Sequence, residues 1–152
     1  MRTPSAVVLL VALALAGCSP GAPKGVSKDA LDSAVSAQVG DPNTCVLIGK
    51  AGSGAVVYQF GSHVTCGKAW PSCEGATERT TDALLKAVAH GGPPVQASCR
   101  SNRDGSRGVG WTAGPVSGHA DLVYAAAMEG ANTPPGVIIA DKLRQAFERG
   151  GL

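Results

Sequence analysis

An uninterrupted apolar run from Ala6 to Ala16 decides how much of this chain is available to fold. Its 11 residues are too few to cross a bilayer as a helix, which takes about 20 residues. Arg2 places a positive charge ahead of the run and small residues follow it, which is the pattern of an export signal. We therefore expect Met1–Gly17 to be removed, which leaves 135 of the 152 residues, enough for one domain in an oxidising compartment.

The residues after the apolar run, Leu15-Ala16-Gly17-Cys18, resemble the lipobox of bacterial lipoproteins in all four positions. The resemblance implies diacylglycerol on the Cys18 thiol, cleavage before Cys18 and acylation of the new N-terminus. Two or three acyl chains hold a protein firmly on a membrane, so the membrane is an expected partner. Ser19 is not acidic, which by the same resemblance implies the periplasmic side of the outer membrane. The alternative is an ordinary export signal with a chance cysteine.

The stretch from Ser19 to Val26 contains two prolines and two glycines without periodicity. We expect residues 18–26 to be a lipid-anchored tether and residues 27–152 to be a single α+β domain. Beyond the signal the chain has 12 basic and 11 acidic residues. This near-neutral balance lacks the excess of positive charge that is typical of nucleic-acid binding. An envelope protein or a cell-wall component is therefore the expected kind of partner, and nucleic acid is not.

Four cysteines remain after Cys18, and an even number in an exported chain predicts two disulfides. Cys66 and Cys73 bracket a short loop and are the expected local pair, which leaves Cys45 with Cys99 to close a long loop. Four cysteines allow three pairings, so the other two stay open. The competing hypothesis is a metal site that includes His63, but no CxxC or HxxxH pair supports it. We expect no metal and no cofactor.

Hydrophobic periodicity and turn residues predict three helices and five strands. The helices are expected over 27–38, over 77–89, and from Thr133-Pro134 to Gly150, and the strands over 45–48, 55–60, 95–100, 108–114 and 121–129. The last strand contains an alanine run that also suits a helix, but Leu-Val-Tyr at its start favours a strand. Consecutive hairpins favour one mainly antiparallel five-stranded sheet, covered by the N-terminal, middle and C-terminal helices.

The pattern Gly110-Trp111-x-x-Gly114, followed by an apolar strand and a closing helix, resembles the sheet half of serine β-lactamases and penicillin-binding proteins. That resemblance implies a degenerate or unrecognised hydrolase. No serine in the chain has a lysine three residues on, however, and no Lys-Thr-Gly precedes Trp111, so we expect no catalytic residues. The element order is also similar to that of profilin-like domains, which implies a ligand-sensing domain instead.

Two regions are candidates for contact with a partner. Trp70 lies beside Pro71 in the loop between two cysteines, where an aromatic side chain can anchor a contact. Arg100, Arg103 and Arg107 cluster around a turn and can meet an anionic partner, although a solvated hairpin tip has the same composition. The leading hypothesis is an envelope lipoprotein with a small disulfide-stapled binding domain and no catalytic activity.

Overall fold

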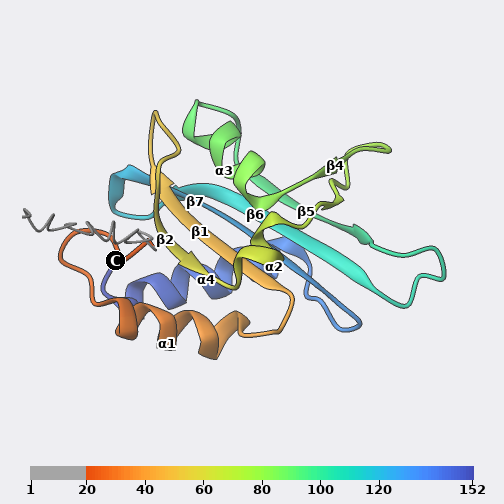
Figure 1. Ribbon diagram of the computed structural model, residues 1–152, viewed down its shortest axis with the longest axis horizontal. Coiled ribbons are helices and arrows are strands. Elements are labelled where there is room, and N and C mark those ends of the chain that lie inside the picture. The colour runs from red at the N-terminus through yellow and green to blue at the C-terminus, as the bar shows by residue number, and fades with distance from the viewer. Residues whose placement is uncertain (1–19) are drawn as a thin grey trace, which may run out of the picture.

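The computed structural model describes residues 20–152 and shows a five-stranded antiparallel sheet with helices on both faces (Figure 1). This confirms the predicted fold class, whereas the predicted signal and Cys18 lie outside the described residues. The strand order is β2-β1-β7-β6-β5, and each neighbouring pair is antiparallel. The elements are α1 (Lys28–Val39), β1 (Thr44–Lys50), β2 (Val56–Phe60), α2 (His63–Gly67), β3 (Trp70–Pro71), β4 (Glu78–Arg79), α3 (Thr81–Ala89), β5 (Val95–Arg100), β6 (Gly108–Val116), β7 (His119–Gly130) and α4 (Gly136–Gly150).

The sheet separates two apolar cores. One core contains α1 and α4 with Val46 and Ile48 of β1, and Figure 1 shows these two helices side by side beneath the sheet. The other contains α3 with Leu47 of β1 and Trp111 of β6. Because successive strand residues point to opposite faces, β1 is buried on both sides and its sequence is a nearly continuous apolar run.

The alanine-rich stretch near the end of the chain is a strand, as predicted. It forms part of β7, which is longer than expected and lies between β1 and β6 at the centre of the sheet. The alanines at 125–127 are buried and paired with both neighbouring strands. The small side chains of Ala125 and Ala127 face α3, which packs directly on this strand, and Ala126 faces the core of α1 and α4. Cross-strand pairing and burial on both faces therefore override the helical tendency of alanine.

Two of the three predicted helices begin at a later residue in the structure than the sequence predicts. α1 begins after Ser27, whose hydroxyl accepts a hydrogen bond from the first turn, as expected. α3 begins after Thr80, later than predicted, because the two residues before that cap form the short strand β4. α4 begins only at Gly136, with Pro135 before it and no side-chain cap. Thr133, at the predicted start of the helix, instead donates its hydroxyl to the carbonyl of Gly130 at 3.3 Å.

Two glycines let α4 approach the sheet closely. A Cβ on Gly136 would collide with the backbone of Trp111 and Ala97. A Cβ on Gly110 would lie 2.5 Å from a methyl group of Ile139 and 2.7 Å from the carbonyl oxygen of Pro134. Close helix-to-strand packing therefore accounts for the first glycine of the Gly110-Trp111-x-x-Gly114 pattern.

The predicted tether is packed against the domain over part of its length. Pro23 is buried, and Val26 packs against the core of α1 and α4. The amide of Val26 donates to the carbonyl of Pro23 at 3.0 Å, which closes a turn. Within residues 20–26, the chain from Pro23 to Val26 is therefore attached to the domain. Between residues 20 and 152, no helix has the length and apolar character needed to span a membrane.

Candidate functional site: a disulfide-held segment

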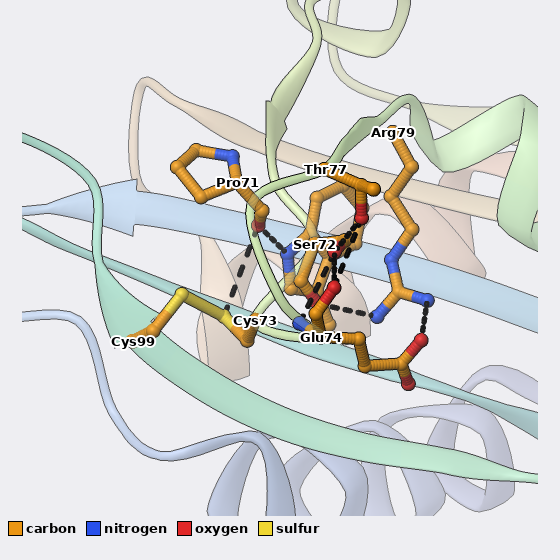
Figure 2. Close-up of a disulfide and its surroundings, with 8 residues drawn as sticks. Pro71, Ser72, Cys73, Glu74, Thr77, Arg79 and Cys99 are labelled. Carbon is orange, nitrogen blue, oxygen red and sulfur yellow. Dashed lines mark hydrogen bonds and ion pairs between the residues drawn. A yellow bond between two sulfur atoms is a disulfide. The ribbon is translucent and has the colours of Figure 1, made fainter.

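Residues 61–80, between β2 and α3, lie on the α3 side of the sheet, and we call them the braced segment. It contains α2 and the two-stranded sheet of β3 and β4. The Cys45–Cys66 disulfide joins α2 to β1, with the Cα atoms 5.1 Å apart. The Cys73–Cys99 disulfide joins the β3–β4 turn to β5, with the Cα atoms 5.4 Å apart (Figure 2). The segment is therefore fastened to two strands that are not neighbours in the sheet.

The predicted disulfide pairing was wrong, although all four cysteines are bonded. We expected Cys66 with Cys73 and Cys45 with Cys99. β1 and β5 are separated by two strands, so a Cys45–Cys99 bond would have to span about 14 Å. Disulfides require Cα atoms within about 7 Å. The β1–β2 hairpin instead places Cys45 beside the end of β2, from which α2 starts immediately.

Trp111 of β6 connects the braced segment to the sheet. Its side chain is 0% exposed and belongs to the core of α3. The indole N–H donates to the carbonyl of Pro71 at 2.7 Å, which ties β6 to β3. The guanidinium of Arg79 lies 5.0 Å from the centre of the Trp111 ring, in cation–π range. Burial lowers the pKa of Arg79, while the nearby carboxylate of Glu74 acts in the opposite direction.

The β3–β4 turn is held by a buried hydroxyl, that of Ser72 (Figure 2). Its oxygen lies 2.6 Å from the hydroxyl of Thr77 and accepts a hydrogen bond from the amide of Glu74 at 3.1 Å. Arg79 donates to the carbonyl of Ser72 at 2.9 Å. Cys73 has φ of 64°, the left-handed conformation, and no other non-glycine residue in the range 20–152 has positive φ. The turn is thus held both by hydrogen bonds and by the disulfide.

The outer surface of the braced segment carries an aromatic, a cationic and an aliphatic side chain. Trp70 is half-buried, with one part packed on the core of α3. The ammonium of Lys68 lies 4.2 Å from the centre of the Trp70 ring. Val64 on α2 is 82% exposed, the largest exposure of any big apolar side chain from residue 20 onward. Trp70 is therefore only partly exposed, and the ammonium of Lys68 lies over its ring.

The three arginines of the predicted contact cluster have different environments. Arg100 and Arg103 are exposed, and neither makes a side-chain hydrogen bond or ion pair with residues 20–152. Arg107 instead binds both carboxylate oxygens of Glu129, at 2.8 and 2.7 Å. Only Arg100 and Arg103 are therefore free to contact an anionic partner.

Glu129 was missed by the sequence analysis. Its carboxylate also accepts hydrogen bonds from Ser101 at 2.7 Å and Asn43 at 3.1 Å, and the residue is 5% exposed. The hydrogen bonds from Arg107 hold the pKa of Glu129 below its ordinary value, against the effect of burial. A single acid at the end of an apolar strand, near an arginine cluster, is the sequence signal that could have revealed this pair.

A groove of about 340 Å³ lies on the opposite face, along α4. Its apolar wall includes Tyr124 and Phe147, whose rings meet edge to face with centres 5.4 Å apart. Burial raises the pKa of Tyr124, whose hydroxyl lies 3.1 Å from that of Thr112. At the rim, Arg144 pairs with Asp141 at 2.7 Å and with Glu148 at 2.9 Å. Two carboxylates against one guanidinium leave the rim with net negative charge.

No group of three or more His, Cys, Asp or Glu side chains in residues 20–152 is arranged to hold a metal ion. Comparison with known protein families, with curated proteins and with solved structures finds no match for this chain. The braced segment and the groove are therefore the features of this domain that bear on its function.

Proposed function

We propose that this protein is an envelope lipoprotein, anchored through Cys18, whose domain binds another envelope component through the braced segment. The supporting observation is the attachment of that segment to both β1 and β5 by separate disulfides. A loop held in one conformation loses little conformational entropy when it binds, and the affinity of the contact rises accordingly. Trp70 and Val64 supply the apolar contact area, and Lys68 supplies a charge.

The proposed anchor keeps this surface close to the membrane. Pro23 is the first buried residue of the described range 20–152, and it lies five positions after Cys18. Such a chain spans at most about 18 Å when fully extended. The domain would therefore work within one molecular diameter of the lipid surface and meet components of the same membrane or of the adjoining cell wall.

Site-specific photocrosslinking in intact cells tests the proposed contact surface. A photoreactive amino acid replaces Val64 on the braced segment or, as the matched control, Ser33, which is exposed on α1 across the sheet. We expect a discrete adduct from position 64 and none of the same mass from position 33. Trp70→Ala should remove the adduct, and Val64→Glu should weaken binding of the purified partner with little change in Tm, because Val64 is 82% exposed.

Two outcomes would contradict the proposed contact. One is the same set of adducts from positions 64 and 33, which would show random encounters. The other is an adduct from position 64 that persists at full yield in the Trp70→Ala protein. Because Trp70 is half-buried, the Tm of that variant must be measured first, and Lys68→Glu, at an exposed position, serves as a second variant.

The groove along α4 favours a second candidate function, the binding of a small molecule by a profilin-like sensory domain. Its volume of about 340 Å³ is at the lower end of the range for small-ligand sites. Screening of low-molecular-weight aromatic and alkyl amines by NMR tests this idea. A binder should shift the signals of Val137 and Leu152, which line the groove, and Ala140→Phe should abolish those shifts by filling it. Shifts that persist in Ala140→Phe would rule out this site.

A further inference from the structure

β5 is an open edge of the sheet, and within the strand the charge of Arg100 at its last position is the one feature that opposes strand pairing. Open edges in native proteins are blunted by bulges, prolines or inward charges. The opposite edge has such a device, because the pairing of β1 with β2 shifts register between Ile48 and Gly49. β5 pairs with β6 without irregularity from Val95 to Arg100 and contains neither proline nor lysine. Its outer side has no backbone hydrogen bond to any of residues 20–152.

The register of β5 shows which of its peptide groups face outward. The amide of Ser101 donates to the carbonyl of Arg107 at 3.1 Å, in the register that also places Ala97 opposite Trp111. Hydrogen-bonded and non-hydrogen-bonded pairs alternate along an antiparallel ladder. The odd-numbered residues of β5 therefore bond to β6. The N–H and C=O groups of the even-numbered residues point away from the sheet, and these residues are Gln96, Ser98 and Arg100.

We propose that β5 pairs antiparallel with β5 of a second copy of this chain, about a twofold axis at Ser98. This is the one register in which all three outward-facing residues find hydrogen-bonding partners. Ser98 then faces Ser98, and Gln96 faces Arg100 of the second copy, so no two like charges stand opposite each other. The pairing joins the two sheets into one and depends neither on the lipid anchor nor on the braced segment.

Charge complementarity across the axis favours a second copy as the occupant of this edge. Gln96 lines the α4 groove, whose rim carries the net negative charge of Asp141, Arg144 and Glu148. The twofold axis brings Arg100 of the second copy next to Gln96 and hence to this rim. Arg100 is exposed and has no ionic partner within residues 20–152. Each chain thus supplies the cation that the acidic groove of the other attracts.

Proline substitution at two adjacent positions tests the pairing, with the full-length protein extracted from membranes in mild detergent. Ser98→Pro removes an outward-facing N–H that the monomer does not use, whereas Ala97→Pro removes one bonded to β6. We expect a dimer mass for the wild type by light scattering and a monomer mass for Ser98→Pro, with its Tm close to that of the wild type. Ala97→Pro should lower the Tm instead.

Cysteine crosslinking and amide exchange keep the proposal testable if Ser98→Pro fails to fold. Facing Cα atoms at the axis would be about 5.5 Å apart, within disulfide range, so Ser98→Cys should give a covalent dimer. Ser53→Cys, exposed in the β1–β2 turn, should not. Exchange of the Ser98 amide should slow by at least about tenfold as protein concentration rises. A monomer mass at all concentrations, or a dimer unaffected at Ser98, would overturn the proposal.

Discussion

At the residue scale, Glu129 shows how one buried side chain can join distant parts of the chain. Its carboxylate binds Arg107 and Ser101 from the β5–β6 loop and Asn43 from the turn before β1. Each of its oxygens has at least two donors, so the cost of burying the charge is offset by charge-assisted hydrogen bonds. The end of β7 is thereby fixed to two loops.

Glu129→Gln should destabilise the protein at neutral pH and reduce its sensitivity to acid. The ordinary pKa of this carboxyl is 4.5, and its pKa in the folded state is lower. Its contribution to stability is therefore complete above pH 4.5 and is lost as the pH falls through the folded-state pKa. We expect a loss of about 2 kcal/mol at pH 7 and a flatter stability profile below pH 4.5 in urea titrations.

Asp121→Asn is the matched control for the Glu129 variant, because Asp121 is exposed and lies outside this network. It should leave both the free energy of unfolding and its acid dependence nearly unchanged. Equal pH profiles for Glu129→Gln and the wild type would mean that the buried pair does not govern acid stability.

At the element scale, the braced segment has little regular structure of its own. β3 and β4 contain two residues each and α2 contains five, too few to be stable in isolation. The segment is ordered because disulfides, the Trp111 indole and the Ser72 hydroxyl fasten it to the sheet. Its conformation therefore depends on cross-links more than on local propensity.

Cys73→Ser with Cys99→Ser should lower the free energy of unfolding by about 3.5 kcal/mol, from the entropy of the loop that this disulfide closes. The cysteines are 26 positions apart. Chemical denaturation measures this loss, and Cys45→Ser with Cys66→Ser should cause a similar one. Peptide mapping of the oxidised protein should recover Cys45 linked to Cys66 and Cys73 linked to Cys99. A Cys66–Cys73 peptide would instead disprove the observed pairing.

The contact of α4 with the sheet gives a second element-scale prediction. Gly136→Ala should cost about 1–3 kcal/mol, because the added methyl meets strand backbone that cannot rotate away. Gly67→Ala, at the end of α2 with no atom within 4 Å of the added methyl, is the matched control and should be neutral. Thermal unfolding of both variants measures the difference. A similar Tm for the two would show that α4 can shift without cost.

At the scale of the whole molecule, helices cover both faces of the sheet and the N-terminal chain packs near the C-terminus. Pro23 and Leu152 line the same surface pocket at one end of the sheet. The expected lipid would therefore be attached at that end. A partner would contact the surfaces that α1 and α4 do not cover.

Cys18→Ser tests the anchor. We expect the wild-type protein to be in the membrane fraction and to begin at residue 18 with the added mass of diacylglycerol. The serine variant should be released into the soluble fraction, because serine provides no thiol for the lipid. Cell fractionation and intact-mass measurement check both expectations. An unmodified N-terminus in the wild type, or membrane retention of the variant, would remove the proposed anchor.

The sequence alone determined the class of fold and most of its strands. Alternating apolar residues and turn signals depend only on neighbours in the chain, so they located five strands and placed Ser27 at the start of α1. The even number of cysteines likewise predicted two disulfides.

The tertiary structure decided whatever depends on which strands are neighbours. Disulfide pairing follows from strand order, which put Cys45 beside α2 and three strand spacings from Cys99. The role of Arg107 was set by a carboxylate 22 positions away on β7. The backbone N–H and C=O groups of β5 that point outward could be identified only from the register of its pairing with β6. Each of these depends on contacts between residues far apart in the chain, which local sequence patterns do not encode.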